Sequence, residues 1–456
     1  MIMEKTAFYI QDFGAVGDGK TKNTVMIQKC IDLCHSKGGG RVILEQGTYV
    51  CGTLYLKSKV TLEIRESAIL LASPDIRDYG TDTHYNRYKN EHDMDRCWIY
   101  AEGQSDFSII GNGEINGNAA AFPNEGSIYR PMMMRFLRCE NIHLSGLRLM
   151  DAAAWTTAFL DCAYIWVENV RIENETNYNG DGLDFDGCSH VFVRGCSITG
   201  TDDNLCLQAG SKEYPTEQIH ISDCEFTSLC AAIRIGLKSV GTIRNVVVTN
   251  CTMKNVWREG IKIECTEGGK ISDITIQNIT MQNVSRPIFV ILNNQFDPEG
   301  LGNSIHLETV PEVGKLERII IQNLLAEDGQ EMESAHYRFG NDLMGAPWFN
   351  GIRFDAAENH FITDVTLENI RYRTVGGVRL AEIPEVYPKI VEQKDLDKKP
   401  EAGNYYPDWS RTTFMDIRNV EGLWLSNVGL EAIYKDERKG YLIEDCNVRR
   451  EEIYVF

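Results

Sequence analysis

The strongest constraint on the fold is a short pattern of alternating apolar residues that recurs about every 27 residues. Clear copies are separated by 23, 26, 28, 27 and 28 residues, and they begin at Cys139, Cys162, Cys188, Thr216, Ile243 and Ile271. After insertions, further copies begin at Leu316, Ile362 and Val420. A repeat of this length indicates a stack of similar units, each burying one face against its neighbours.

The alternation within each copy predicts strands with one buried face, and Asn, Asp and Gly residues mark the turns between them. Each repeat is therefore expected to be one coil of a parallel β-helix, which makes the fold all-β. A leucine-rich-repeat horseshoe is the alternative, but the spacing of Leu and Asn does not fit it. Most of the 14 cysteines occupy inward positions of these strands, so we expect buried free thiols.

The first part of the chain carries a different period. In TKNTVMIQKCIDLCHSKGG, apolar residues near a 3.6-residue spacing predict a helix that ends at Gly38, Gly39 and Gly40. The apolar positions are Val25, Ile27, Ile31, Leu33 and Cys34. This helix is expected to cap the open end of the solenoid, within a cap of about residues 1–70. We expect a single domain over residues 1–456, with long insertions near 285–315, 326–361 and 373–419.

Charge and composition exclude several classes of protein. The chain has 46 basic and 66 acidic residues and a net charge of −20, which argues against a nucleic-acid partner. It shows neither a signal peptide nor a run of about 18 apolar residues, so we expect no membrane span. Together with the free cysteines, this predicts a cytoplasmic location. The Cys and His spacings resemble no metal motif, and no cofactor is expected.

Alignment of successive coils places acidic residues in one column. When Leu183, Leu205, Ile233 and Ile261 are aligned, a preceding column reads Asp181, Asp203, Ala231 and Glu259, with Asp202 next to Asp203. We therefore expect Asp181, Asp202 and Asp203 to converge on the solvent face of two adjacent coils. The next outward column contains Asp184, Cys206, Arg234 and Lys262, and the one after it contains Asp186, Gln208, Gly236 and Glu264.

Grouped carboxylates suit acid/base glycoside chemistry, because close like charges raise the pKa of one group and leave another ionised. Asp-Asp and Asp-Gly also mark ordinary turns, which is the simpler interpretation of the same residues. Clustered acids bind Ca²⁺ as well, but no Asp-x-Asp-x-Asp-Gly spacing is present, so no metal site is predicted.

Segments spread over nearly the whole chain resemble glycoside hydrolase family 28, the polygalacturonase-like enzymes. They include DFGAVGDGKTKNT near the start, IIGNGEINGN at 109–118, RPMMMRF at 130–136 and IPEVYP at 383–388. NGDGLDFDGCSHVFVRGCSITGTDDNLCLQAG, from Asn179 to Gly210, resembles the family's Asn-Thr-Asp and Asp-Asp motifs in order and spacing. The resemblance implies a single-stranded right-handed parallel β-helix. It also implies that Asp202 is the general acid, while Asp181 and Asp203 deprotonate water in an inverting displacement.

Other positions depart from the family pattern. The family's Gly-His-Gly motif falls on Cys230-Ala231-Ala232, and its Arg-Ile-Lys motif falls on Lys262-Ile263-Glu264. A Lys that often follows the Asp-Asp strand corresponds to Gln208. In polygalacturonases, such basic residues hold the substrate carboxylate. Gln208 and Glu264 therefore work against a uronate, whereas Arg234 and Lys262 leave that question open.

The sequence predicts an exo-acting, inverting glycosidase that releases a terminal neutral sugar, rhamnose-like or pentose-like, from plant glycosides or pectin-derived oligosaccharides. The alternatives are an exo-polygalacturonase, a pectin lyase, and a non-catalytic carbohydrate-binding or fibre-like β-helix. The partner is then a small carbohydrate, and the sequence leaves a homo-oligomer open.

The candidate substrate-binding residues are Asn179, Asp184, Gln208, Arg234, Lys262, Glu264, Glu259 and Trp155. For Glu259 a solvated turn is the preferred interpretation. Stacking walls are expected from Trp155 and from His84, Tyr85, Arg87, Tyr88 and Trp348.

Overall fold

The computed structural model describes residues 7–83, 96–124, 130–294, 311–328, 351–382, 410 and 412–456. The chain divides into two compact units. Of the described residues, the first unit holds 7–83, 96–124, 130–202 and 219–224, and the second holds the remainder. Every strand pairing with a stated register in these residues is parallel, so the predicted all-β parallel β-helix is confirmed.

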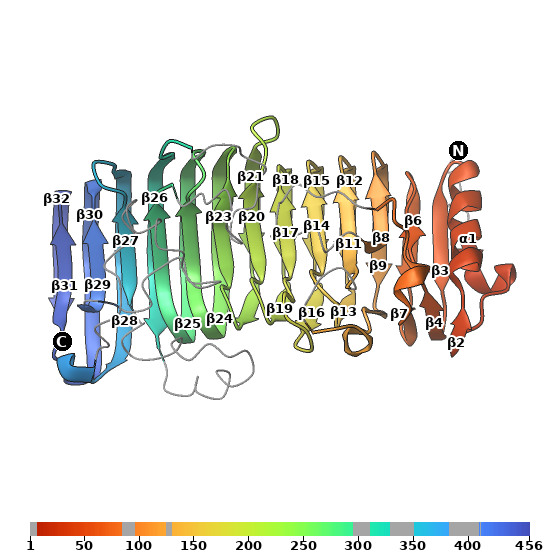
Figure 1. Cartoon of the computed structure of the whole chain (residues 1–456), viewed down its shortest axis with the longest axis horizontal. Coiled ribbons are helices and arrows are strands. Elements are labelled where there is room, and N and C mark those ends of the chain that lie inside the picture. The colour runs from red at the N-terminus through yellow and green to blue at the C-terminus, as the bar shows by residue number, and fades with distance from the viewer. Residues whose placement is uncertain are drawn as a thin grey trace. The chain divides into compact units, whose positions relative to one another are not determined.

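Parallel strands of the first unit form three ladders, each joining equivalent strands of successive coils (Figure 1). One ladder contains β1 (Ala7–Tyr9), β3 (Gly40–Leu44), β6 (Val60–Ile64), β9 (Ser105–Gly111), β12 (Glu140–Ser145), β15 (Ala163–Glu168) and β18 (Ser189–Arg194). The second contains β2 (Asp18–Lys22), β4 (Gly47–Cys51), β7 (Ala68–Ala72), β10 (Glu114–Asn116), β13 (Arg148–Met150), β16 (Arg171–Asn174) and β19 (Ser197–Gly200). The third contains β5 (Leu54–Tyr55), β8 (Cys97–Glu102), β11 (Met132–Leu137), β14 (Thr157–Leu160) and β17 (Leu183–Asp186).

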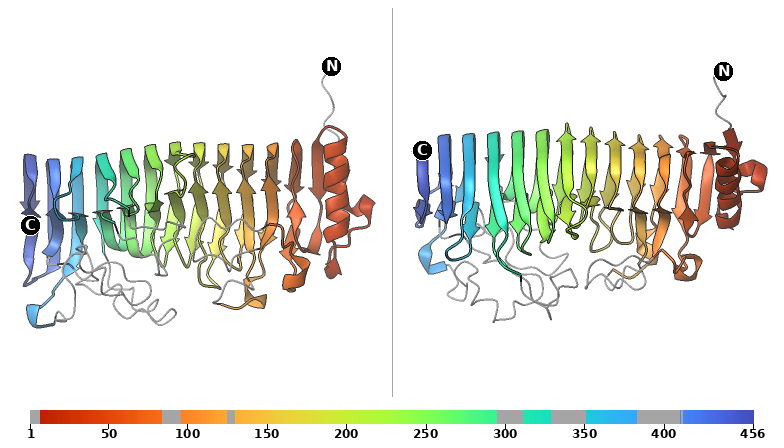
Figure 2. Two further views of the ribbon diagram at one scale, coloured as in Figure 1. Left: turned by 45° about the horizontal axis from the view of Figure 1, so that its top comes forward. Right: turned by 90° about the horizontal axis from the view of Figure 1, so that it is seen from above.

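The predicted helix is present as α1 (Thr24–Ser36), and it packs against β1, β3, β5 and β6 beside the first coil (Figures 1 and 2). Its buried residues are Ile27, Cys30, Ile31 and Cys34, which lie on one helical face. The expectation that Val25 and Leu33 face the core is wrong, because both are exposed. The helix ends where the sequence predicts. Gly39 has φ +106, and a Cβ there would lie 2.4 Å from the Lys59 carbonyl oxygen. Short 3-10 helices complete the unit: η1 (Ile10–Phe13), η2 (Ile76–Asp78) and η3 (Ala119–Ala121).

The interior of the first unit contains a row of phenylalanines from successive coils. Phe107, Phe136, Phe159 and Phe185 have ring centroids 5.2, 5.3 and 4.9 Å apart, with the first two contacts edge-on and the third stacked. All 14 cysteines of the chain are free thiols, 12 of them buried and two, Cys230 and Cys446, half-buried. The prediction of buried free thiols is therefore largely confirmed. Coils stack at the strand spacing, so equal side chains at equal positions fill the core without gaps.

Strands of the second unit become longer as turns between them are lost. They are β20 (Leu205–Ala209), β22 (Glu225–Ser228), β23 (Ile233–Ser239), β24 (Thr242–Cys265), β25 (Lys270–Leu292), β26 (Lys315–Glu327), β27 (Ile352–Ala356), β28 (Ile362–Gly376), β29 (Thr412–Arg418), β30 (Val420–Tyr434), β31 (Lys439–Glu444) and β32 (Asn447–Val455). The chain also contains β21 (Thr216–Ser222) and η5 (Leu380–Glu382). Ile243, Ile271 and Leu316 are paired in register, as are Ile362 and Val420, so the predicted repeat starts are correct.

An exposed row of asparagines marks the bends of the second unit. Asn250, Asn278, Asn323, Asn369 and Asn427 are joined by side-chain hydrogen bonds of 3.0, 3.0, 3.1 and 2.8 Å. Each has a φ between 53° and 56°, a left-handed conformation that Asn tolerates better than most residues. The Asn that follows the apolar pattern in the sequence is therefore the residue that turns the chain.

The boundaries of the predicted insertions need correction. Residues 285–292 continue strand β25, residues 352–356 form β27 and residues 412–418 form β29. Residues 295–310, 329–350 and 383–409 lie outside the described residues.

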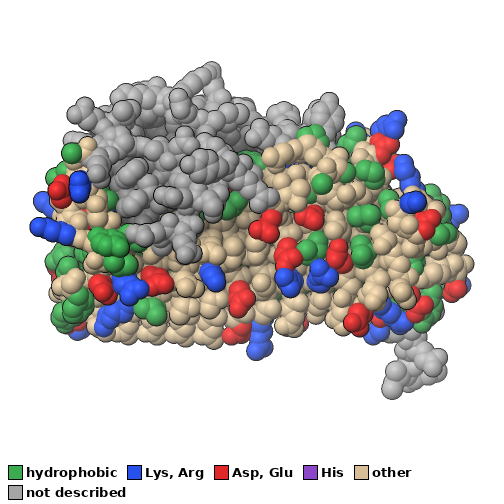
Figure 3. Space-filling view, turned by 90° about the horizontal axis from the view of Figure 1, so that it is seen from below, with side chains coloured by type: hydrophobic (Ala, Val, Ile, Leu, Met, Phe, Trp, Pro, Cys, Tyr) green, Lys and Arg blue, Asp and Glu red, His purple; other side chains and the backbone are tan. Residues whose placement is uncertain are grey.

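Two observations concern the partners that the sequence excluded. The described residues contain no helix long and apolar enough to cross a membrane. Where side chains are coloured, Figure 3 shows acidic and basic groups interspersed over the face that it draws.

Candidate active site

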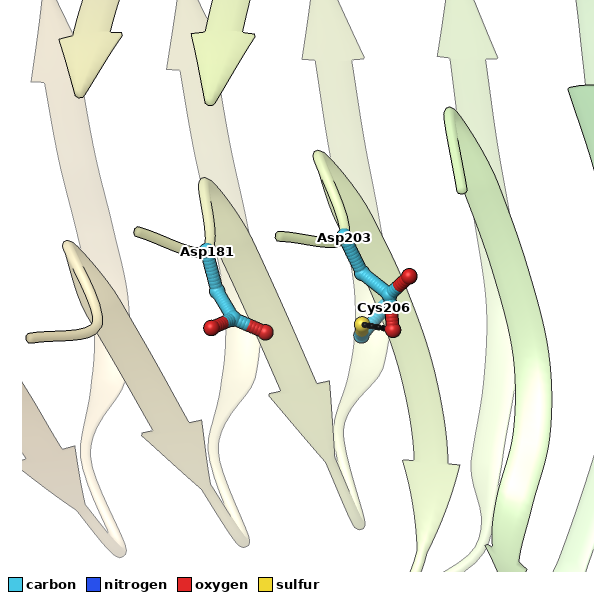
Figure 4. A group of neighbouring side chains, drawn as sticks. All are labelled: Asp181, Asp203 and Cys206. Carbon is cyan, nitrogen blue, oxygen red and sulfur yellow. Dashed lines mark hydrogen bonds between the residues drawn. The ribbon is translucent and has the colours of Figure 1, made fainter. Parts of the chain in front are cut away.

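Asp181 lies on the turn that leads into β17 of the first unit and is buried (Figure 4). Its carbonyl oxygen accepts hydrogen bonds from Thr156 N, at 3.0 Å, and from Thr156 Oγ1, at 2.6 Å. The preceding residue, Gly180, donates its N–H to Thr201 Oγ1 at 3.0 Å. A Cβ on Gly180 would lie 2.6 Å from that oxygen, so the turn requires glycine. These contacts fix the backbone from which the Asp181 carboxylate projects.

Asp202 is the most exposed of the three predicted catalytic acids and is only partly buried. Its Oδ2 accepts a hydrogen bond from Asn179 Nδ2 at 3.2 Å. Asn179 Oδ1 in turn accepts from Arg130 Nη2 at 2.8 Å, and Arg130 is itself buried. Asn179, predicted to bind substrate, therefore contacts one of the predicted catalytic acids. Arg130 was not predicted as a site residue, although the motif RPMMMRF that begins with it could have drawn attention to it.

Other candidates of the first unit are more buried than expected. Asp184 and Asp186 lie on β17, in register with Ala158 and Leu160 of β14. Both are buried, which corrects the prediction of solvent-facing columns. Trp155 is 6% exposed, so it does not offer a stacking face to solvent. The other proposed wall residues, His84, Tyr85, Arg87, Tyr88 and Trp348, lie outside the described residues.

Asp203 begins the second unit and is 1% exposed. Its Oδ1 accepts the backbone N–H of Ala231 at 3.0 Å, and its Oδ2 accepts Arg234 Nη1 at 2.6 Å. The Cys206 thiol also donates to Oδ2, at 3.7 Å (Figure 4). Burial raises the pKa of Asp203, but the positive charges of Arg234 and Lys262 outweigh that effect and hold the pKa well below its usual value. Asp203 is therefore an anion across the physiological range.

Arg234 and Lys262 occupy one column of the second unit, as predicted, with Cys206 before them. Arg234 bridges two acids, because its Nε also donates to Glu264 Oε2 at 2.9 Å. Lys262 Nζ lies 3.5 Å from Glu264 Oε1 and 3.5 Å from Glu259 Oε2. Both cations are therefore in contact with carboxylates of the protein. Gln208 is buried, and the ladder shifts register between Leu207, which pairs with Ile235, and Ala209, which pairs with Ser239.

The interpretation of Glu259 as a solvated turn residue is wrong, because Glu259 is completely buried. It lies 3.5 Å from each of three cations, Arg258, Lys262 and Arg286. Burial raises its pKa, but the charges of Lys262, Arg258 and Arg286 lower it further, so Glu259 is an anion. Arg286 pairs in register with Glu259 on the next coil. Extending the sequence alignment by one more coil would have found it.

The donor set around Asp203 does not favour a metal ion. Sγ atoms of Cys206 and Cys230 lie within 4.8 Å of its carboxylate oxygens, and thiolates and carboxylates are metal-ligand types. However, the Arg234 guanidinium is already 2.6 Å from Oδ2. A cation bound to that oxygen would be repelled at close range.

Comparison with known proteins identifies the family to which these acids belong. The family Glycosyl hydrolases family 28 matches residues 52–305, more than half of the chain. This chain belongs to that family.

Relatives and solved structures agree with this assignment. A probable polygalacturonase of Arabidopsis thaliana is 29% identical over 300 residues, which are 62% of this chain and 60% of that protein. Exopolygalacturonase B of Aspergillus niger is 24% identical over 307 residues, covering 63% and 68% of the two chains. The family 28 exopolygalacturonase of Yersinia enterocolitica superposes with a TM-score of 0.70 at 18% identity, over 97% of this chain and 78% of that one. These neighbours share the right-handed parallel β-helix. The chain spans 60% and 58% of the length of the first two curated relatives.

Proposed function

We propose that this protein is an exo-acting, inverting glycoside hydrolase that releases a terminal neutral sugar from plant glycosides or pectin-derived oligosaccharides. Family membership supports hydrolysis over a lyase reaction and over a purely binding or fibre-like role. The ionised, buried Asp203 supports a catalytic carboxylate at the predicted position.

In the proposed reaction, Asp202 donates its proton to the leaving glycosidic oxygen as the bond from that oxygen to the anomeric carbon breaks. Water attacks the same carbon from the opposite face. Asp181 and Asp203 together hold this water, and one of them accepts its proton. The half-exposed Asp202 suits a group that must reach the substrate. The low pKa of Asp203 suits a base that is already ionised. The products are one sugar of inverted anomeric configuration and one free hydroxyl.

The preference for a neutral sugar rests on one observation, the contacts of Lys262. This ammonium lies 3.5 Å from both Glu259 and Glu264, and Glu264 also holds Arg234. A uronate carboxylate approaching Lys262 would meet two carboxylates that are already there. A neutral hydroxyl carries no such repulsion.

A galacturonide is the second candidate substrate. It is favoured by the names of the relatives, among them exopolygalacturonases of Arabidopsis thaliana and Aspergillus niger. A rhamnogalacturonase A of Aspergillus niger, 24% identical over 230 residues, is also among them. Exo action and a cytoplasmic location are further parts of the proposal. They rest on the sequence expectation of long insertions beside the groove and of cysteines outside disulfides, and none of the cysteines forms a disulfide here.

The test compares substrates that differ only in one carboxylate. Purified protein and Asp202→Asn are incubated with matched oligosaccharides ending in galactose, galacturonate, rhamnose or arabinose, and the released monosaccharide is measured by chromatography. We expect release of a neutral sugar that Asp202→Asn abolishes, with the fresh product showing inverted configuration by proton NMR. Faster release of galacturonate would support the second candidate. No release from any substrate by folded protein would refute the proposed function.

A further inference from the structure

We propose that Arg234, held in place by Glu264, is a positioning residue that fixes the Asp203 carboxylate for its role as catalytic base. This inference rests on the proposed function, since it assigns the supporting residues of the same site. Neither residue is expected to touch the reacting atoms. Their effect on the reaction passes through Asp203.

The geometry points to this role because two nitrogen atoms of the Arg234 guanidinium donate hydrogen bonds to two different acids. Nη1 donates to Asp203 Oδ2 at 2.6 Å, and Nε donates to Glu264 Oε2 at 2.9 Å. The Arg234 side chain is 16% exposed, Asp203 is 1% exposed and Glu264 is not exposed. A guanidinium held at both ends has little freedom to turn, so Asp203 Oδ2 is fixed in one orientation.

The other carboxylate oxygen of Asp203 is fixed by the backbone. Ala231 N–H donates to Oδ1 at 3.0 Å, and Ala231 falls where the family resemblance expects a histidine. An alanine supplies no side-chain cation or donor. The cationic partner of Asp203 comes instead from Arg234, three residues later, on β23.

Glu264 explains why Arg234 takes this position. Arg234 and Lys262 are adjacent in one column, so the two cations would repel each other without an intervening anion. Glu264 lies between them, with Oε2 on Arg234 and Oε1 3.5 Å from Lys262. A lysine at position 264, as in the family pattern, would place a third positive charge beside Arg234.

Several charged groups face Asp203 within its unit. Arg234 of β23 contacts it directly, Lys262, Arg258 and Glu259 of β24 act at longer range, and the thiols of Cys206 and Cys230 lie beside it. Asp202 precedes it in the chain. Of the cations, Arg234 forms the direct contact, so its removal is expected to change the protonation of Asp203 most.

The test uses Arg234→Gln, Arg234→Lys, Glu264→Gln and the double variant Arg234→Gln/Glu264→Gln. The double variant removes one positive and one negative buried charge, so it separates a folding defect from a catalytic one. Arg318→Gln is the matched control, because Arg318 also bridges two acids, Asp273 and Glu317, on the solvent-exposed side of the second unit. Rates on the best substrate are measured from the lowest pH at which the protein stays folded up to pH 9.

In Arg234→Gln and in the double variant, we expect kcat to fall roughly 10²-fold with little change in KM, because a misplaced base loses its contribution to the transition state. The acid limb of the profile should move up by about 1–3 pH units, since Asp203 then protonates more readily. Arg234→Lys should recover part of the rate, and Glu264→Gln, which keeps an acceptor for Arg234, should lose less than Arg234→Gln.

The inference would be overturned by a double variant that folds, keeps the wild-type kcat and shows an unshifted acid limb. If the wild type hydrolyses nothing, the proposed function fails separately. The inference is then decided by a carbon-13 carboxyl titration of Asp203, assigned by Asp203→Asn. An unchanged Asp203 titration in the double variant would refute it, and a raised pKa would uphold it.

Discussion

Two arginines of the second unit each bridge two acids, yet one bridge is buried and the other is in water. Arg234 joins Asp203 and Glu264 at 2.6 and 2.9 Å, and Arg318 joins Asp273 and Glu317 at 2.6 and 2.5 Å. The distances are almost equal, but the Arg234 side chain is 16% exposed and the Arg318 side chain 47%. The comparison shows that contact geometry alone does not reveal what an ion pair does.

The difference lies in the surroundings. Water and salt screen the charges of the exposed bridge. When one of its three side chains is removed, the other two are solvated by water and ions. The buried bridge has no such replacement, so loss of one member leaves an uncompensated charge in a medium of low dielectric constant. Only the buried bridge is therefore expected to control both folding and the ionisation of a catalytic group.

The largest expected difference between the bridges is catalytic. Asp203→Asn should lower kcat roughly 10³-fold, because a positioned general base contributes about 10²–10⁴. Asp273→Asn, in the exposed bridge, should keep the wild-type rate. Both rates are measured on the same sugar-releasing substrate. Equal rates for the two variants would remove the functional distinction between the bridges.

The next largest expected difference between the two bridges is in the free energy of unfolding. Arg234→Met leaves Asp203 and Glu264 buried without their shared cation and should cost about 3–5 kcal/mol at pH 7. Arg318→Met should leave the unfolding midpoint close to that of the wild type. Urea denaturation followed by circular dichroism measures both, and Arg234→Met/Glu264→Gln should regain part of the loss. A similar midpoint for both single variants would contradict the role of burial.

The pH dependence gives a further distinction. Hydrogen bonding by Arg318 leads the causes that lower the pKa of Asp273 to about 2, whereas in Asp203 the charges of Arg234 and Lys262 overcome burial. Both carboxyls have lowered pKa values in the folded state, so each contributes stability that is complete above the unfolded-state pKa and lost as pH falls through the folded-state pKa. At pH 2 we expect Asp273 to be about half protonated. Carboxyl carbon-13 titrations follow both groups, and a titration midpoint at or above the usual value for either carboxyl would contradict its lowered pKa.

The smallest expected effect concerns an exposed contact without charge. Asn278 hydrogen-bonds to Asn250 and Asn323 at 3.0 Å each and has φ 56°. Asn278→Ala should destabilise the protein by about 1–2 kcal/mol, mainly because alanine is strained in this left-handed conformation. Asn278→Gly should recover most of that loss, as measured by the urea midpoint. If alanine and glycine behaved alike, the side-chain hydrogen bonds rather than the backbone would carry the effect.

Much of the fold was predictable because the structure of each coil in a solenoid is determined mainly by residues close together in the sequence. The repeat starts at Ile243, Ile271 and Leu316 are paired in register, and α1 ends at the predicted glycines. The core position of the cysteines also followed from the alternation, since every coil repeats the same inward positions. Prediction failed at Val25, which fits the helical pattern but is exposed, and at residues 285–292, which extend a strand.

The candidate site was predicted less completely than the fold. The column that contains Arg234 and Lys262 is real, and Asn179 contacts Asp202. Arg130 and Arg286 were missed, and Glu259 was assigned to solvent although it is buried among cations. A sequence alignment shows which residues share a column, but it does not show how far a long side chain reaches across columns.

The sequence by itself determined the repeat, the parallel coils, the inward cysteines and the positions of the acidic residues along the chain, because strand alternation and turn chemistry act between near neighbours. Only the tertiary structure decided which charges are buried and how they are paired. Glu264 illustrates this, since the sequence shows only an acid where a lysine was expected, whereas the structure shows it holding Arg234 on Asp203. The physical reason is that the energy of a charge depends on its distance from every other charge and on the exclusion of water, and both are properties of the folded chain.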